Sequence, residues 1–553
     1  MNQPPTIAIA SDYYLTNFSF LVNWVAERYW DLLDENERIF LKKFQQLSHS
    51  SQCLFVRLSS RKGNLFRTDK LSYAEIDSLE HAAQGLIDSD FIKNDSLLSL
   101  AEICSLLTKV EILNIFRNEL KEYKSERKDV LVEVLTQHYP ALKKWQYWTN
   151  DKLGEVYRLE TDHIVSNFLL LFFGNAHQNL TEFVLQDLGL FRYESYVIHQ
   201  DNRIFKSRTE LEEYRALLLL REQFSEFTTL DELVAITEHL TEVSKSKAME
   251  ARYARFYNQL AYEFERFGQY DIAYSLYQKS HLPPARERRI RLLEKQGDDA
   301  SAWQLLNELI NTPHNEHEMQ IGERMATRLS KKVGMTLTKK LPLSILTSQL
   351  SLTRLHNETG NFLNVEEIAR LHFDTESAPC FYVENQLLTG LFGLWLWPEI
   401  FRNVDGAFAN PFQSAPLDMY ETSFIGLRPQ IEDLWALFDT NSHQQHIRSY
   451  WQEKNGIENQ FVNWRYLDEV ALEYALVCIP AAHLKLIFER LLFDIKNNRS
   501  GLPDLIQFFP ENQNYRMLEI KGPGDRIQDN QQRWMEFFLK NGISAEVIYV
   551  SWQ

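Results

Sequence analysis

The sequence predicts a multidomain α+β protein that is largely helical in its N-terminal and middle regions and ends in an α/β domain. Three observations lead to this fold class. A chain of 553 residues is too long for one hydrophobic core and should divide into about three or four domains. The hydrophobic periodicity is almost wholly helical from about residue 160 to 375. From Gly501 onward, two short apolar runs separated by a polar turn are typical of β-strands.

The charge and the cysteines limit the classes of function. A formal net charge of −17 at pH 7 argues against unselective binding to polyanions, so any nucleic-acid partner must meet local basic patches. The four cysteines contain no Cys-x-x-Cys pair, which indicates neither a disulfide framework nor a zinc finger. No secretory signal is visible, and no apolar run approaches the roughly 20 residues of a membrane span. We therefore expect an intracellular protein without a membrane partner.

The N-terminal region combines helices with a basic segment. Residues 12–50 carry apolar side chains at helical spacing, and Leu54 to Leu58 is predicted to be a strand. This strand, a turn at Gly63 and a second short strand form a predicted hairpin. One acid, Asp69, stands there against five basic residues, Arg57, Arg61, Lys62, Arg67 and Lys70, which leaves a local charge of +4. The hairpin is either a solvated basic surface or a contact to phosphates, and we assign residues 1–90 as a basic DNA-binding region.

A set of short helices follows in residues 91–150. Two amphipathic helices, Leu100 to Leu107 and Lys109 to Leu120, precede a third, Arg127 to Leu135. The arrangement resembles a SAP-type helical DNA-binding module. Its last turn and helix start would present Lys124, Arg127 and Lys128 to phosphates, since a helix N-terminus favours anions. An ordinary helical linker with a basic turn is the alternative.

Residues 151–375 form the predicted helical middle domain. Small and aromatic residues recur in two copies of a helix pair, Gly268, Ala273 and Tyr277, then Gly297 and Ala302. The spacing resembles a short, degenerate tetratricopeptide-type array, which usually provides a surface for partner proteins. A basic stretch near its end either lines a DNA path or forms one charged helix face: Arg324, Arg328, Lys331, Lys332, Lys339 and Lys340.

The residues that carry chemistry lie in a predicted β-hairpin near the C-terminus. Folding the chain about the polar turn at residues 510–514 brings Asp504 close to Glu519. Glu519 and Lys521 are two residues apart on one strand and project from the same face. Two carboxylates and an ammonium group therefore converge.

This grouping suits metal-dependent hydrolysis of a phosphodiester. Carboxylate oxygens hold Mg²⁺ or Mn²⁺, which polarises the phosphate and lowers the pKa of a bound water. Lys521 can then orient or activate that water. Two neighbouring carboxylates without a cation would repel each other and have a raised pKa, so a divalent ion also resolves their repulsion.

The same residues carry a family resemblance. The Pro-Asp … Glu-x-Lys pattern of Asp504, Glu519 and Lys521 resembles the restriction-endonuclease-like nucleases. The Lys-Gly-Pro-Gly-Asp-Arg segment that follows, with Gln531 and Trp534, resembles the VRR-type nuclease domain, placed at 376–553. Residues 54–71 and 406–418 resemble the Fanconi-associated nuclease family in its short bacterial form, so that the likeness covers most of the chain.

The resemblance implies a metal-dependent DNA phosphodiesterase. It implies a structure-selective endonuclease that cuts 5′ flaps in interstrand-crosslink repair, and it allows 5′-to-3′ exonuclease activity. It assigns metal binding to Glu384, Asp504, Glu519 and the carbonyl of Ile520, with Mg²⁺ or Mn²⁺ as the cofactor. It assigns catalysis to Lys521, Glu519, Asp504 and Gln531, with Gln531 supporting either the lysine or the rest of the site from the adjoining helix. For Glu384, a favourable charge at a helix N-terminus is the alternative.

Two other functions stay open at this point. One is a non-catalytic helical scaffold for DNA-repair partners, and the other is an RNA-processing or sequence-specific restriction enzyme that uses the same metal chemistry. The expected partner is branched DNA, recognised by shape through phosphate contacts, with protein partners on the helical array. The expected location is the cytoplasm of a bacterium, in association with the nucleoid.

Overall fold

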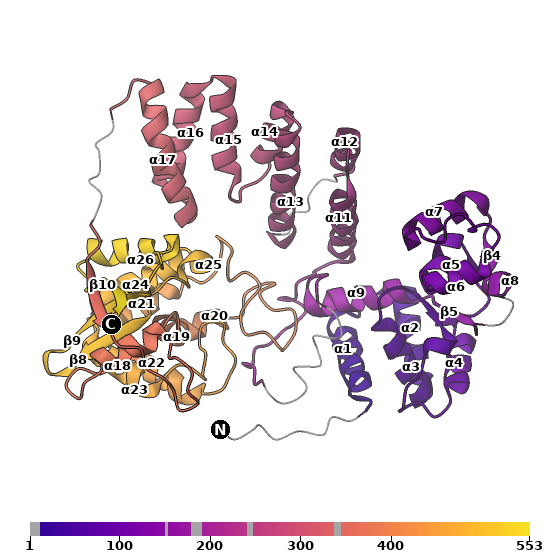
Figure 1. The fold of residues 1–553 in the computed structure, drawn as a ribbon, viewed down its shortest axis with the longest axis horizontal. Coiled ribbons are helices and arrows are strands. Elements are labelled where there is room, and N and C mark those ends of the chain that lie inside the picture. The colour runs from indigo at the N-terminus through magenta and orange to yellow at the C-terminus, as the bar shows by residue number, and fades with distance from the viewer. Residues whose placement is uncertain (1–10, 150–152, 179–190, 241–246, 337–343) are drawn as a thin grey trace. The chain divides into compact units, whose positions relative to one another are not determined.

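The computed structural model divides into two compact units, Met1–Leu190 and Phe191–Gln553 (Figure 1). It describes residues 11–149, 153–178, 191–240, 247–336 and 344–553. The first unit is helical with two small sheets, and the second combines a helical array with a five-stranded sheet. The predicted fold class is confirmed.

The first unit begins with three helices, α1 (Tyr13–Tyr29), α2 (Glu35–Gln46) and α3 (His49–Ser59). Ser48 begins α3 by accepting a backbone N–H bond at its N-cap position. The strand predicted for Leu54 to Leu58 is wrong, because this segment lies inside α3. Its apolar residues are all buried, and periodicity cannot separate a fully buried strand from a buried helix.

A small antiparallel sheet ties the end of this unit to its beginning. β5 (Val156–Leu159) lies between β1 (Leu65–Arg67) and β2 (Ile92–Lys93). The helix after β5, α9 (Asp162–Phe173), packs on α1. Strand pairing and helix packing therefore place residues 156–173 with the N-terminal helices and not with the helical middle domain that was predicted to begin at residue 151.

The predicted trio of short helices is present with its own core. It consists of α5 (Leu100–Leu106), α6 (Lys109–Ile115) and α7 (Lys128–His138). Ser99 and Thr108 each begin a helix with a capping box, in which the glutamate three residues later returns a bond. The remaining elements of the unit are η1 (Thr68–Lys70), α4 (Leu79–Asp88), β3 (Leu97–Leu98), β4 (Lys143–Lys144) and α8 (Trp145–Thr149).

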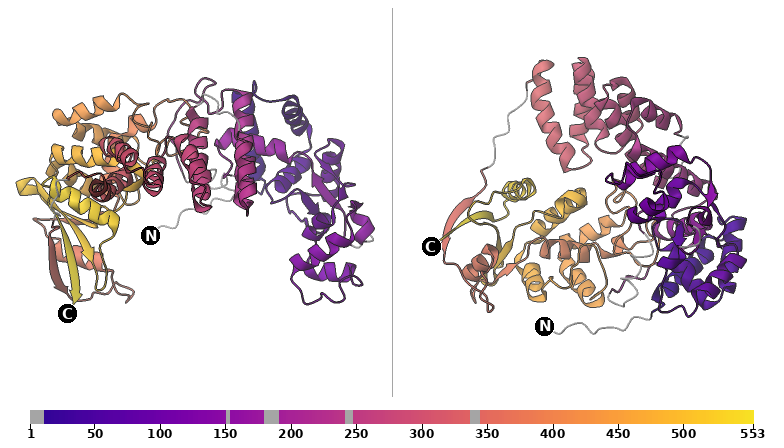
Figure 2. Two further views of the ribbon diagram at one scale, coloured as in Figure 1. Left: turned by 90° about the horizontal axis from the view of Figure 1, so that it is seen from above. Right: turned by 45° about the vertical axis from the view of Figure 1, so that its right-hand side comes forward.

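The second unit carries a stack of helices in which each packs on the next along the chain (Figures 1 and 2). Gly268 and Gly297 end two of these helices with positive φ angles of 76° and 83°. Ala273 and Ala302, each five residues after its glycine, are fully buried. The repeated small residues therefore lie where helices pack closely, as predicted. The helices are α11 (Arg208–Glu226), α12 (Leu230–Glu238), α13 (Lys247–Arg266), α14 (Tyr270–Gln278), α15 (Ala285–Gln296), α16 (Asp299–Asn311) and α17 (Glu316–Lys332).

The five-stranded sheet has the strand order β6-β10-β9-β8-β7. β6, β10 and β9 run parallel, whereas β8 pairs antiparallel with both β9 and β7. The strands are β6 (Thr347–Leu352), β7 (Cys380–Tyr382), β8 (Leu505–Phe509), β9 (Asn514–Lys521) and β10 (Ala545–Trp552). The predicted start of the nuclease domain at residue 376 is wrong, because β6 belongs to the same sheet.

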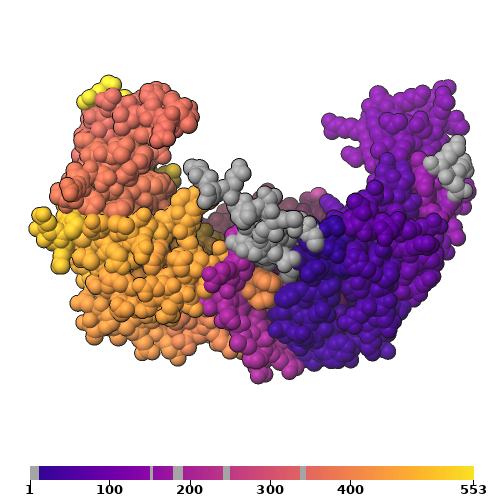
Figure 3. Space-filling view, turned by 90° about the horizontal axis from the view of Figure 1, so that it is seen from below, coloured from indigo at the N-terminus to yellow at the C-terminus, as the bar shows by residue number. Residues whose placement is uncertain are grey.

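Helices cover both faces of this sheet. α18 (Val365–Phe373) packs on the face that carries Leu505, Leu518 and Ile520. In Figure 3 the salmon-coloured part of the chain lies beside the orange part. Eight helices of the described chain contribute buried residues to the larger core on the other face. They are α19 (Leu387–Trp395), α20 (Trp397–Ile400), α21 (Ile431–Asp439), α22 (His443–Glu453), α23 (Glu469–Cys478), α24 (Ala481–Phe493), the short α25 (Ile495–Asn498) and α26 (Asp529–Lys540).

The apolar helices of this domain are core helices. Among the described residues, no single helix has the length and apolar content needed to cross a membrane, although the bent pair α23 and α24 meets both criteria together. Leu476 of α23 and Leu484 of α24 are both buried in the protein interior. All four cysteines are buried free thiols.

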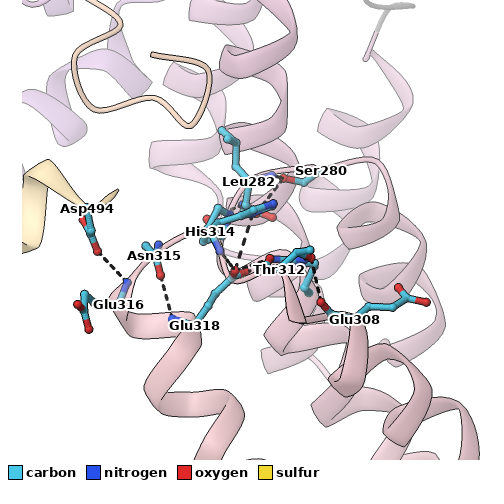
Figure 4. Close-up of polar contacts among 12 residues, drawn as sticks. Ser280, Leu282, Glu308, Thr312, His314, Asn315, Glu316, Glu318 and Asp494 are labelled. Carbon is cyan, nitrogen blue, oxygen red and sulfur yellow. Dashed lines mark hydrogen bonds and ion pairs between the residues drawn. The ribbon is translucent and has the colours of Figure 1, made fainter. Parts of the chain in front are cut away.

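Two segments attach the rest of the second unit to the sheet domain. Tyr196 donates a hydrogen bond to the Asn410 carbonyl at 2.7 Å, so the chain before the array is fixed to the C-terminal part. At the other end of the array, Asp494 accepts a bond from the Glu316 backbone at the start of α17, at 3.0 Å (Figure 4). Arg490 adds an ion pair with the Glu316 carboxylate at 3.1 Å.

We predict that Gly501 is required for the close approach of the segment before β8 to the start of α26. Its φ of +88° disfavours any side chain, and an added Cβ would lie 2.8 Å from the backbone carbon of Asn530. Gly501→Ala should therefore lower the apparent unfolding midpoint in urea, with a free-energy cost of about 2–4 kcal/mol. Gly524→Ala is the matched control, since Gly524 has a φ of +92° but no atom within 4 Å of the added Cβ. Equal losses in both variants would refute the steric role of Asn530.

Candidate active site

The hairpin of β8 and β9 brings the three predicted residues together. Leu505 pairs with Leu518, so Asp504 and Glu519 are neighbours across the two strands. Glu519 and Lys521 continue the face of β9 that carries Met517, which belongs to the larger core. The predicted convergence of two carboxylates and one ammonium group is therefore present in the structure.

Hydrogen bonds fix the orientation of each group. Lys521 Nζ donates to Glu519 Oε1 at 2.6 Å, and the backbone N–H of Ile520 donates to Asp504 Oδ2 at 2.8 Å. All three side chains are buried, with exposed fractions of 7% for Asp504, 0% for Glu519 and 8% for Lys521. The site is thus a set of charges held in a medium of low dielectric constant.

The buried carboxyl groups of the site have raised pKa values, which an added positive charge would lower. Burial raises the pKa of the Asp504 carboxyl to about 6, and the charges of Glu366 and Glu384 add to the rise. Burial, followed by the charge of Asp504, raises the pKa of Glu519 to about 8, although Lys521 opposes the shift. One lysine therefore does not compensate the carboxylates around it.

Glu384 lies in the turn between β7 and α19, three residues before the helix begins. Two bonds fix the backbone on either side of it. The N–H of Val383 donates to the Asp504 carbonyl at 2.8 Å, and Asn385 Oδ1 accepts from the Leu502 N–H at 3.1 Å. The Glu384 carboxylate accepts a hydrogen bond from the Tyr382 hydroxyl. Glu384 thus belongs to the turn that adjoins Asp504 and does not lie in the first turn of α19.

The residues present fit a divalent cation. Glu519 Oε2 is buried and has no hydrogen-bond partner among the described residues, so it is an acceptor without a donor. Within the same described ranges, no three His, Cys, Asp or Glu side chains are already gathered as a metal cluster. The fit rests on the unpartnered oxygen of Glu519 and on hard carboxylate ligands, which suit Mg²⁺ and Mn²⁺.

Two residues near the site were not identified from the sequence. Tyr382 lies two residues before Glu384, a spacing that places both side chains on one face of an extended chain. Glu366 lies in the first turn of α18, which packs on β9, the strand that carries Glu519 and Lys521. The spacing of Tyr382 and Glu384 could have identified Tyr382 from the sequence. The position of Glu366 could not be identified in this way, because it depends on the packing of α18 against β9.

The roles predicted for Gln531 and Ile520 remain predictions. Gln531 Oε1 accepts a bond from the backbone N–H of Gln528 at 3.0 Å, as part of the capping box of α26. Ile520 contributes its N–H to Asp504, as described above. Trp534, the other residue of the VRR-type resemblance, is buried and donates from Nε1 to the Asn498 carbonyl at 3.2 Å.

The basic residues predicted to contact DNA divide into two groups. Six are not in a described ion pair and reach solvent at least in part, namely Arg61, Lys62, Lys70, Lys124, Arg127 and Lys128. Arg127 and Lys128 lie at the start of α7, where unpaired backbone N–H groups favour an anion. These residues keep their predicted role.

Arg67 and Arg57 are held by internal contacts. Arg67 is 4% exposed, and its guanidinium binds Asp69 at 2.7 Å and Glu111 at 2.9 Å, which joins β1 to α6. Its assignment as a DNA contact is therefore wrong, because a buried and doubly paired arginine cannot reach a phosphate. Arg57 pairs with Glu75 at 2.6 Å and lies over the ring of Tyr14, so its charge is compensated.

The basic stretch at the end of the array is also partly compensated. Arg328 pairs with Glu294, and Lys332 pairs with Asp299 at 3.0 Å. These contacts join α17 to the helices before it and favour the interpretation of a charged helix face. Lys339 and Lys340 lie outside the described residues.

Comparisons with known protein families match three segments of the chain. The VRR-NUC domain matches residues 439–552, the FAN1 HTH domain residues 12–93, and the Fanconi anemia-associated nuclease SAP domain residues 97–148. The VRR-NUC match contains Asp504, Glu519 and Lys521. Nucleases of this restriction-endonuclease-like type depend on a divalent metal.

Whole-chain comparisons agree with the domain matches. The Fanconi-associated nuclease 1 homolog of Pseudomonas aeruginosa is 39% identical over 98% of this chain and 96% of its own length. The rice homolog is 26% identical over 98% of this chain and 63% of its own length. The crystal structure of paFAN1 bound to 2-nucleotide 5′ flap DNA with a gap has 38% identity and a TM-score of 0.83, with 100% of both chains covered. The chain belongs to the Fanconi-associated nuclease family and is a DNA nuclease.

Proposed function

We propose that this nuclease cleaves branched DNA at 5′ flaps, through the site built by Glu384, Asp504, Glu519 and Lys521, in the repair of interstrand crosslinks. The observation that carries the proposal is the buried contact of Lys521 with Glu519 beside Asp504. The solved paFAN1 complexes, which contain DNA with 1- and 2-nucleotide 5′ flaps, support the substrate class.

The residues of the chain have separate tasks in hydrolysis. Asp504, Glu519 and Glu384, with the Ile520 carbonyl, would hold Mg²⁺ or Mn²⁺, and such a cation would supply polarisation of the phosphate and a lower pKa for water. Lys521, held by Glu519, orients the attacking water toward phosphorus. The Ile520 N–H keeps Asp504 in place, which limits the reorganisation needed during the reaction.

Recognition of the substrate would depend on its shape. The accessible candidate contacts are lysines and arginines suited to phosphates, so no sequence preference is expected. The exposed helical array is proposed to bind protein partners, as helical repeats commonly do. We also propose a cytoplasmic, nucleoid-associated location in a bacterial cell, where branched chromosomal DNA occurs.

Removal of Lys521 or Asp504 tests the chemistry. Lys521→Ala and Asp504→Ala should each lower the rate of cleavage of a 5′-labelled flap by about 10²-fold or more, because one loses the water-orienting group and the other a metal ligand. The same assay with Mg²⁺ and with Mn²⁺ identifies the preferred metal and maps the products. Lys540→Ala, an exposed lysine at the end of α26, is the control and should cleave normally.

The same assay separates the alternative functions. A non-catalytic scaffold would bind the flap without cutting it in either metal. An RNA-processing or sequence-specific enzyme would prefer RNA or one duplex sequence over flaps in a panel measured at fixed salt. Equal cleavage by wild type and Asp504→Ala would remove Asp504 from the mechanism.

The raised pKa of Asp504 predicts a pH-dependent stability in the absence of metal. In the unfolded chain this carboxyl loses its proton near pH 4, whereas in the folded protein its pKa is about 6. As pH rises from 4 through 6, unfolding releases a proton, so the folded state loses stability. At pH 8 in EDTA, Asp504→Asn should therefore be more stable than wild type by about 1–3 kcal/mol.

The advantage of Asp504→Asn should shrink as pH falls to 4 and below, because Asp504 is then protonated in the folded wild type and becomes protonated in the unfolded state as well. Addition of Mn²⁺ at pH 8 should raise the thermal midpoint of wild type and have little effect on the variant. A stability difference that does not change with pH would contradict the buried, uncompensated charge.

The exposed cations of the first unit should contribute to DNA binding. Arg61→Ala and Lys128→Ala should each weaken flap binding and reduce the slope of log K against log salt by about 1, because each removes one phosphate contact. Mn²⁺ affinity should not change. Lys42→Ala, an exposed lysine on α2, is the control. Binding by both variants that equals wild type across the salt titration would refute this role.

A further inference from the structure

Tyr382, a partly exposed residue at the edge of the candidate active site, contacts the carboxylate of Glu384. The hydroxyl of Tyr382, the last residue of β7, donates a hydrogen bond to Glu384 Oε2. Tyr382 is placed by its pairing with Leu505, the residue after Asp504. Its side chain is 45% exposed, so the ring lies at the solvent-accessible edge of the site.

The backbone of the Glu384 turn is fixed, but its side chain depends on Tyr382. The bonds from Val383 to Asp504 and from Leu502 to Asn385 hold only the main chain and the neighbouring residue. Within the described part of the chain, the Tyr382 hydroxyl is the one hydrogen-bond partner recorded for the Glu384 carboxylate. A free glutamate side chain loses up to about 2 kcal/mol of rotamer freedom when it is ordered.

Charge repulsion acts against the position that a metal ligand must take. The negative charge of Glu384 adds to the raised pKa of both Asp504 and Glu519, so moving its carboxylate toward them is opposed by repulsion. Glu384 is exposed, unlike the other two, and can rotate away into water. A neutral hydroxyl donor limits this rotation without adding charge.

We propose that Tyr382 is a positioning residue, whose hydroxyl restrains the Glu384 carboxylate on the turn that adjoins Asp504, from which it serves as the third carboxylate for the divalent cation. The inference rests on the proposed metal site and extends it by one residue. Partners that orient a metal ligand typically affect metal affinity by about 10–100-fold when they are removed. Tyr382 acts through Glu384 and is not itself a ligand in this proposal.

Tyr382→Phe tests the inference, since it removes the hydroxyl and keeps the exposed ring. The full-length protein would be titrated with Mn²⁺ in the absence of DNA, with free Mn²⁺ measured by electron paramagnetic resonance. We expect the dissociation constant for Mn²⁺ to rise by about tenfold. In the flap assay, the loss of activity should be greater at low Mn²⁺ than at saturating Mn²⁺.

Tyr466→Phe is the matched control, because Tyr466 is a 64% exposed phenol in the same unit and its hydroxyl is in no described hydrogen bond. It should bind Mn²⁺ as wild type does. Thermal midpoints of both variants in EDTA should equal that of wild type, which shows that the fold is intact.

Two results would overturn the inference. Unchanged Mn²⁺ affinity in Tyr382→Phe would show that Glu384 does not need the hydrogen bond from Tyr382. Tighter Mn²⁺ binding would show that the hydroxyl competes with the metal for the carboxylate. Asp504→Ala, measured in the same titration, separates this failure from a failure of the site itself. If Asp504→Ala also keeps wild-type Mn²⁺ affinity, the proposed metal site is wrong; if it loses affinity while Tyr382→Phe does not, only the role of Tyr382 is wrong.

Discussion

The pairing of β8 with β9 is the constraint on which the active site depends. Its register sets Asp504 against the end of β9, where the carboxylate accepts the Ile520 N–H and where Lys521 reaches Glu519. Helices cover both faces of the sheet, so these charges lie away from bulk water. A buried carboxylate is costly unless it is compensated, and one lysine cannot compensate two or three of them. The same burial that raises the pKa values of Asp504 and Glu519 therefore favours the binding of a cation.

The elements that bury the hairpin come from distant parts of the sequence. β6 and α18 precede the hairpin by more than a hundred residues, yet β6 extends the sheet next to β10 and α18 packs on β9. The chain before the helical array and the start of α17 are both fixed to the same domain. The nuclease domain is thus assembled from segments on both sides of the array, which is the reason that a single cut at residue 376 does not describe it.

In the basic segment of the first unit, some arginines are paired with carboxylates among the described residues and others are not. Arg61 and Arg67 lie on the same short stretch and contribute equally to its formal charge. Arg67 is buried between two carboxylates and joins β1 to α6, whereas Arg61 is exposed and in no described ion pair. A count of charges cannot distinguish an arginine that binds the protein from one that is available to bind DNA. The distinction depends on where Glu111 lies, on a helix more than forty residues away.

The sequence by itself determined the family, the fold class and the three central residues of the site. Asp504, Glu519 and Lys521 are local to one hairpin, so strand alternation and a short turn are sufficient to bring them together. The tertiary structure decided what depends on contacts between distant segments: the helix in place of a strand at Leu54 to Leu58, the membership of β6 in the sheet, and the position of Glu366 near the site. Local patterns report which face of an element is apolar, but they do not report which other element covers it. The burial of a side chain, its pKa and the compensation of its charge all depend on which element covers it.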